Sequence, residues 1–137
     1  MAADSCRTAT LTLSLTVDDP ADAADFYCRA FGAQRLCQAN GGDGRVAWSE
    51  LRIGDSTLML SDEGAREARS PLSLRGTTAC VRLRVPDAPR LAQQALEAGA
   101  RLQGSERNGC CRLTDPFGHH WVLETEGLRQ PPTPNGS

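Results

Sequence analysis

The chain has 137 residues and a mass of 14.7 kDa, which is enough for one domain with a single core. Apolar residues make up 39 % and charged residues 23 %, and 17 acidic against 15 basic side chains leave a net charge of −2. This balance argues against a nucleic-acid partner, because such proteins carry an excess of basic residues. All 15 basic residues are arginine, which excludes lysine Schiff-base chemistry.

The distribution of apolar residues also argues against a membrane partner. No run approaches the ~18 consecutive apolar residues of a membrane span. Residues 1–16 lack the charged-then-apolar order of a signal peptide, so we expect a cytoplasmic protein. In that compartment the six cysteines are expected to be free thiols, and no C-x-x-C pair suggests a zinc site.

The sequence repeats itself at an offset of about 65 residues, which we take as the sign of two related modules. Residues 11–33 and 78–100 each contain an alternating strand that ends in valine, then an Asp, a Pro, an amphipathic helix and a Gly-Ala stop. A second pair of similar segments begins at Gly54 and Gly118. The repeat predicts strand–helix–strand–strand–strand twice.

Local signals place the boundaries of these elements. The first helix is expected to begin at Asp18 or Asp19 and to stop at Gly32, and the second to run from Asp87 to Gly99. Strands are predicted over 34–39, 45–53 and 56–62. We expect an arm (1–9), one domain (10–126) made of two modules (10–62 and 77–126) joined by a polar linker (63–76), and a Pro-rich disordered tail (127–137).

Four motifs carry a family resemblance: DFYCRAFGA (25–33), GRVAWSELRIGDSTLMLSDE (44–63), ALEAGA (95–100) and DPFGHHWVLET (115–125). Through these motifs the chain resembles members of the vicinal oxygen chelate superfamily, which includes glyoxalases, bleomycin-resistance proteins and dioxygenases. Within that superfamily it resembles the PhnB-like subgroup. The resemblance implies an α+β fold, with two tandem βαβββ modules forming a curled mixed sheet around a cleft. It also implies a homodimer, because many relatives form their clefts between two chains.

The resemblance further implies where a metal would be held in metal-dependent relatives. Matched to the motifs, those positions on the first and last strands of each module hold Thr12, Met59, Cys80 and Val122. A valine offers no ligand atom and a threonine only a neutral hydroxyl, whereas divalent cations take carboxylate, imidazole or thiolate ligands. We therefore expect no metal and no cofactor.

Alternation along each strand predicts which side chains face the helices and which face the cleft. Leu11, Leu13 and Leu15 are expected to pack against the helix, and one of Cys110 and Cys111 is expected to face the cleft. The side chains predicted to line a ligand-binding cleft are Thr12, Ser14, Trp48, Glu50, Met59, Cys80, Arg82, His120 and Val122.

Several of these residues have two possible roles. Trp48 could stack on a planar ligand or fill a core position. Arg82 could hold an anion, pair with Glu50 or be a solvated strand end. His120 is the obvious acid–base candidate, although a polar residue is usual in this hairpin, and Glu50 could act as a base if desolvated.

Three functions are compatible with these residues. The first is a metal-free protein that binds and sequesters a planar or partly apolar small molecule, and the missing ligands and Trp48 favour it. The second is a metal-dependent lyase, transferase or dioxygenase. The third is a structural subunit without catalytic activity. Because one fold hosts many activities, the fold does not decide between them.

Overall fold

The computed structural model describes residues 9–64, 68–104 and 109–127, so nearly all of the predicted arm and tail lie outside the described residues. The predicted order of elements occurs twice, which confirms an α+β fold built from two βαβββ modules. The elements are β1 (Leu13–Val17), α1 (Pro20–Phe31), β2 (Gln34–Asn40), β3 (Val46–Ile53), β4 (Ser56–Asp62), α2 (Pro71–Leu74), β5 (Cys80–Val85), α3 (Ala88–Ala98), β6 (Arg101–Leu102), β7 (Cys110–Thr114) and β8 (His120–Thr125).

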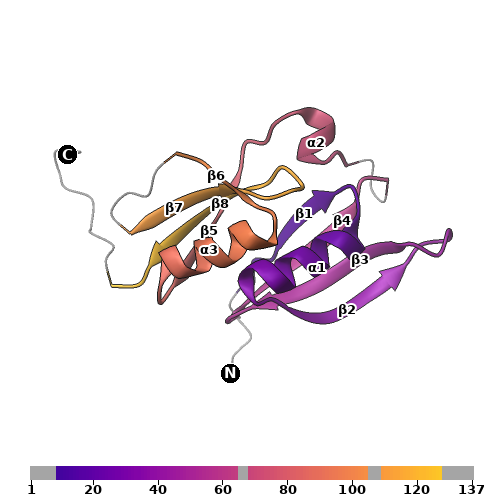
Figure 1. The fold of residues 1–137 in the computed structure, drawn as a ribbon. Helices are drawn as coiled ribbons and strands as arrows, with labels where there is room; N and C mark the ends of the chain where they lie inside the picture. The colour runs from indigo at the N-terminus through magenta and orange to yellow at the C-terminus, as the bar shows by residue number, and fades with distance from the viewer. Residues whose placement is uncertain (1–8, 65–67, 105–108, 128–137) are drawn as a thin grey trace, which may run out of the picture.

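Each module contains a four-stranded mixed sheet, in the order β1-β4-β3-β2 and β5-β8-β7-β6 (Figure 1). The first strand of each module pairs in parallel with the last, and the other pairs are antiparallel. Consequently β1 and β5 are both edge strands.

The two long helices, α1 and α3, begin and end where the sequence indicates. Asp19 caps α1 by accepting a hydrogen bond from the backbone N–H of Asp22, and Asp87 caps α3 in the same way. Gly32 ends α1 with a left-handed φ of 71°, which costs glycine little.

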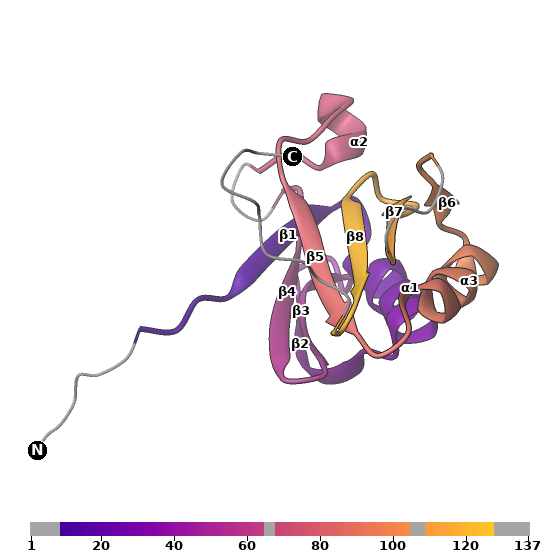
Figure 2. The same cartoon turned by 90° about the vertical axis from the view of Figure 1, so that its left-hand side faces the viewer.

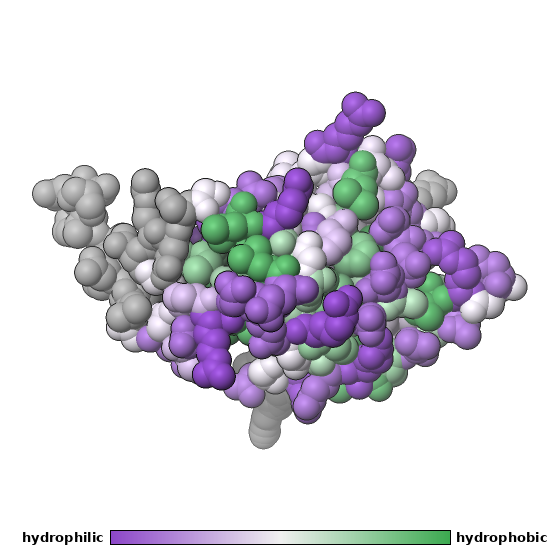
Figure 3. Space-filling view, in the orientation of Figure 1, coloured by the Kyte–Doolittle hydropathy of each residue, from purple (hydrophilic) through white to green (hydrophobic). Residues whose placement is uncertain are grey.

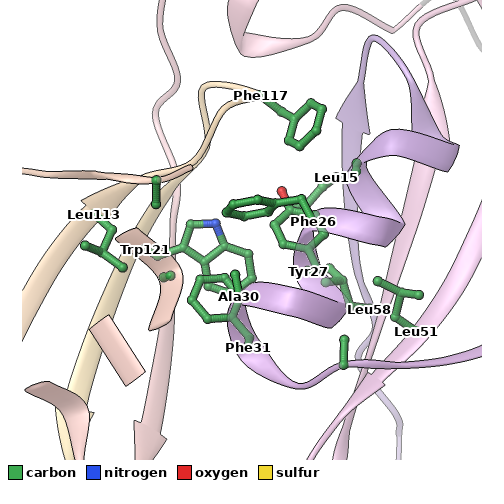
Figure 4. Packing of buried hydrophobic residues seen from close by; sticks show 14 of the residues in the cluster. Leu15, Phe26, Tyr27, Ala30, Phe31, Leu51, Leu58, Leu113, Phe117 and Trp121 are labelled. Atoms are coloured by element: carbon green, nitrogen blue, oxygen red, sulfur yellow. The ribbon is translucent and has the colours of Figure 1, made fainter. Parts of the chain in front are cut away.

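A single core joins the modules, because α1 and α3 lie side by side and each contributes to it (Figures 1 and 2). In Figure 4 the indole of Trp121, from β8, points at the aromatic rings of α1. Its centroid is 4.4 Å from that of Phe31 and 5.3 Å from that of Tyr27. The helix-facing sides of both sheets are buried in this core, so the opposite face of each sheet, here called its open face, points away from it.

A buried carboxylate reinforces the contact between the modules. Asp115, which is 4 % exposed, lies at the start of the β7–β8 hairpin. Its Oδ2 accepts hydrogen bonds from the Tyr27 hydroxyl and from Trp121 Nε1 at 2.8 Å. Its Oδ1 accepts from the backbone N–H groups of Phe117 and His119, both at 2.9 Å. The DPFG segment (115–118) therefore ties α1 to the second module.

The segment between the modules contains a short helix that the sequence analysis did not predict. Ser70 caps α2 and donates its hydroxyl hydrogen to Glu63, and Pro71 occupies the first turn. Gly118 packs beneath this helix with a φ of +90°, and a Cβ there would lie 2.8 Å from the Cβ of Pro71. Only glycine fits at this contact.

The expectation for the start of β1 was wrong in one respect. Leu15 is buried and Leu13 partly exposed, but Leu11 precedes the strand and is 95 % exposed, because no sheet partner reaches it within the chain. Elsewhere the surface in Figure 3 is mainly hydrophilic, with apolar residues in separate patches. No helix among the described residues is long and apolar enough to cross a membrane.

Candidate small-molecule site

The open face of the first sheet carries four of the predicted lining residues, and a fifth lies just before β1. Register places Ser14, Met59 and Glu50 in one row across β1, β4 and β3, so their side chains leave the same face. Trp48 lies two residues along β3 on that face and is half-buried. Thr12 precedes β1 and is exposed. Together these positions supply one indole, one thioether and one carboxylate, besides two hydroxyl groups.

Glu50 has a neighbour that the sequence analysis did not include. Cys37 on β2 continues the same row, and its thiol donates a hydrogen bond to Glu50 Oε1 at 3.3 Å. This hydrogen bond, followed by partial desolvation and the carboxylate charge, raises the pKa of Cys37. The thiol at this exposed position is therefore a poor nucleophile near neutral pH.

The open face of the second sheet carries the other four predicted residues. Cys80 pairs with His120, and Arg82 pairs with Val122, in two neighbouring rows across β5 and β8. All four line a cavity of about 390 Å³, whose remaining walls are Thr77, Thr78, Ala79, Gln103, Arg112, Leu113 and Trp121. Gln103 and Arg112 were not among the predicted lining residues. Arg112 lies opposite Val122 on β8, so its side chain leaves the same face, and alternation along β7 would have indicated this.

Arg82 forms an ion pair with Glu124, and not with Glu50 as one alternative from the sequence proposed. Its Nη1 lies 2.7 Å from Oε2 of Glu124, a buried carboxylate on β8, whereas Glu50 lies on the other sheet. That hydrogen bond and charge raise the pKa of Arg82, against the opposing effect of burial. The alternative that Arg82 pairs with Glu50 is therefore wrong within one chain. More than half of the Arg82 side chain stays exposed and available to a ligand.

The two adjacent histidines have different surroundings. His119 is buried, and its Nε2 lies 2.9 Å from the carbonyl oxygen of Thr16, so it links the hairpin to β1. His120 is half-buried and lines the cavity, and its Nδ1 lies 3.2 Å from Oγ1 of Thr114. Only His120 is placed to meet a ligand.

A second cavity of about 980 Å³ lies where the β3–β4 turn meets β5 and the start of α3. Its lining includes Arg84, Asp87 and Arg90, but Arg82 is its only member among the predicted site residues. Although it is larger, it wraps around the edge of β5. The other predicted residues lie on or beside the open faces instead.

The donor atoms at the four family metal positions do not suit a divalent cation. Val122 is buried and has no donor, Met59 has only a thioether, and Thr12, which precedes β1, has only a neutral hydroxyl. Within the described ranges, no three His, Cys, Asp or Glu side chains come close enough to hold a metal ion. The residues present therefore do not fit the metal that this fold holds in metal-dependent proteins.

The structure thus places the predicted lining in two groups on two sheets. Register and the smaller cavity bring Cys80, Arg82, His120 and Val122 together. Ser14, Trp48, Glu50 and Met59 share the open face of the other sheet. Both open faces point away from the common core.

Comparison with known proteins identifies the family. Residues 9–123 match the Glyoxalase/Bleomycin resistance protein/Dioxygenase superfamily. The chain belongs to this superfamily. An uncharacterized protein of Mycobacterium bovis is 39 % identical over 124 residues, which cover 82 % of this chain and 80 % of that protein.

Two solved structures are similar to this chain in fold. A gene product from Arabidopsis thaliana is 26 % identical, with a TM-score of 0.72 over 86 % of this chain and 99 % of that one. TnmS3, an antibiotic binding protein from Streptomyces sp. CB03234, is 21 % identical, with a TM-score of 0.66 over 88 % and 98 % of the two chains. At that identity the likeness to TnmS3 concerns the fold alone.

Proposed function

We propose that this superfamily member is a metal-free protein that binds and sequesters a planar, partly apolar small molecule. The half-buried indole of Trp48 carries the proposal, because it lies on an open face beside the row of Met59 rather than in the core. An aromatic platform with a few polar groups is typical of small-molecule sites. The unsuitable donor set at the four metal positions supports a site without metal.

We further propose that two copies of the chain form each cleft. Each chain presents two open faces that point away from its core, and the sheet edges β1 and β5 are unprotected. Apposing the first sheet of one copy to the second sheet of the other would bring the Trp48 group to the Arg82 group.

We also propose membership of the PhnB-like subgroup, on the resemblance carried by the four motifs. We also place it in the cytoplasm. Cys28, Cys37, Cys80 and Cys110 form no disulfide in the structure, and free thiols of this kind persist in that compartment.

Removal of the indole tests ligand binding. A panel of planar polycyclic antibiotics is added to the purified protein, and thermal denaturation is followed. A compound at ~100 times its Kd stabilises the native state by about 2.7 kcal/mol, which gives a clear rise in Tm. We expect Trp48→Ala to weaken binding about tenfold or more and Trp48→Phe, the matched control, to retain most of it. Equal affinities for the wild type and Trp48→Ala would contradict the assignment.

Mixing two defective variants tests whether the cleft is shared. Trp48→Ala alters the first sheet, and Cys80→Tyr fills the cavity on the second from an exposed position. In a dimer with shared clefts, co-expression should restore about a quarter of the sites, because half of the dimers are mixed and each has one intact cleft. Titration of the mixture with the best compound of the panel measures this fraction. No restored sites would show that each cleft belongs to one chain.

A further inference from the structure

A thiol, an imidazole and a guanidinium, those of Cys80, His120 and Arg82, line one cavity on the open face of the second sheet. Cys80 and His120 are register partners on strands that lie about 4.8 Å apart, and both line the 390 Å³ cavity. Cys80 is exposed and is a free thiol. The contact with Thr114 holds the imidazole of His120 by its Nδ1. When Nδ1 carries the ring proton, Nε2 is left to accept a proton from a neighbouring thiol.

Arg82 supplies a positive charge at the same place. It follows Cys80 by two residues on β5, so both side chains leave the same face, and the two groups interact electrostatically. The ion pair with Glu124 fixes the guanidinium over this face. A thiol beside an arginine and a histidine has the setting of a reactive cysteine, in contrast to Cys37, which lies beside the carboxylate of Glu50.

We propose that Cys80 is a nucleophile that captures α,β-unsaturated carbonyl compounds covalently, with His120 as the proton carrier and Arg82 as the group that stabilises the enolate. The inference rests on the proposed function for the location of the site, and it names a chemical class of ligand for it: planar enones and quinone-like compounds. Val122 gives the cavity an apolar wall that suits the carbon skeleton of such a ligand.

The step is balanced without an added oxidant or reductant. The Cys80 thiol gives its proton to Nε2 of His120, and the sulfur electron pair forms a C–S bond to the β-carbon of the ligand. The C=C π bond breaks and its electrons move to the carbonyl oxygen, whose negative charge lies beside the Arg82 guanidinium. The imidazolium then returns the proton to the α-carbon, so the product is a neutral thioether.

Modification by N-ethylmaleimide, a small planar α,β-unsaturated imide, tests the inference. The full chain is treated at pH 7, quenched at intervals and analysed cysteine by cysteine by peptide mass spectrometry. We expect Cys80 to react about tenfold or more faster than Cys37, because His120 and Arg82 assist its attack, whereas the hydrogen bond to Glu50 raises the pKa of the Cys37 thiol. Cys80→Ser, which lacks the nucleophile, confirms the assignment of the modified peptide. A Cys80 rate at or below that of Cys37 would overturn the inference.

Substitutions of the two assisting groups separate chemistry from accessibility. His120→Gln and Arg82→Gln should each slow Cys80 about tenfold while the rate of Cys37 stays constant. Arg82→Lys should restore most of the rate because it keeps the charge. Arg84→Gln is the matched control, since Arg84 also pairs with Glu124 but lines the other cavity, and it should leave the rate unchanged. Unchanged Cys80 rates in both glutamine variants would overturn the roles assigned here.

Failure of this inference can be distinguished from failure of the proposed function. If Cys80 is slow but planar compounds still bind in a Trp48-dependent way, reversible binding stands and covalent capture is rejected. If Cys80 is fast and no planar compound stabilises the protein, capture stands and sequestration is rejected.

Discussion

Replacing Asp115 by alanine is expected to remove most of the stability of the fold. The substitution leaves four buried donors without an acceptor: the Tyr27 hydroxyl, Trp121 Nε1 and the N–H groups of Phe117 and His119. Each unsatisfied buried group costs about 1–3 kcal/mol, whereas a domain of this size is stable by about 5–15 kcal/mol in total. Urea unfolding followed by circular dichroism measures the loss.

A conservative variant and a surface variant control this experiment. Asp115→Asn retains one carbonyl oxygen for the donors and should lose less stability than the alanine variant. Asp22→Ala, at an exposed position of α1, should change the free energy of unfolding by no more than about 0.5 kcal/mol. If Asp115→Ala proved as stable as Asp22→Ala, the carboxylate would not join the modules as described.

Above pH 10 the protein should lose stability through Tyr27, the single tyrosine of the sequence. Burial, then the charge of Asp115 and its hydrogen bond to the hydroxyl, raise the pKa of Tyr27 well above its ordinary value of 10.0. The neutral phenol is therefore favoured in the native state. Its contribution is complete below pH 10 and is lost as the pH rises towards the native pKa, by up to about 1.4 kcal/mol per pH unit.

Because there is one tyrosine, absorbance at 295 nm reports its ionisation directly. The midpoint should lie well above pH 10 in native protein and near 10 in urea. The Tyr27→Phe variant should be less stable at pH 8, because Asp115 loses a donor, but its stability should fall less steeply above pH 10. A native midpoint near 10 would show that the hydroxyl is not held by Asp115.

The repeated pattern made most of the fold predictable. Asp19, Gly32, Asp87 and Gly99 lie at the ends of the two helices because capping and left-handed stops depend on local chemistry. Alternation likewise predicted that Glu50 and His120 leave the face of their sheet opposite the helices, since the side-chain period of a strand is two.

Contacts across strands and between modules were not predictable, because they depend on register and packing rather than on spacing. Arg82 pairs with Glu124 instead of Glu50, because β5 neighbours β8 and the two glutamates lie on different sheets. Cys37 meets Glu50 only through the register of β2 with β3, which shifts near that residue. The four donors to Asp115 come from two modules, and no local pattern links Tyr27 to the DPFG turn.

Metal-free binding of a small molecule is tested most directly by thermal denaturation of untagged, metal-stripped protein. Each of Mg²⁺, Mn²⁺, Zn²⁺ and Fe²⁺ is added alone, followed by the panel of planar compounds. We predict a rise in Tm with at least one planar compound, lost in Trp48→Ala, and no rise with any cation, because among Thr12, Met59, Cys80 and Val122 only Cys80 offers a ligand that such cations take. A large rise with a divalent cation, and none with a planar compound, would contradict the account and favour a metal-dependent enzyme.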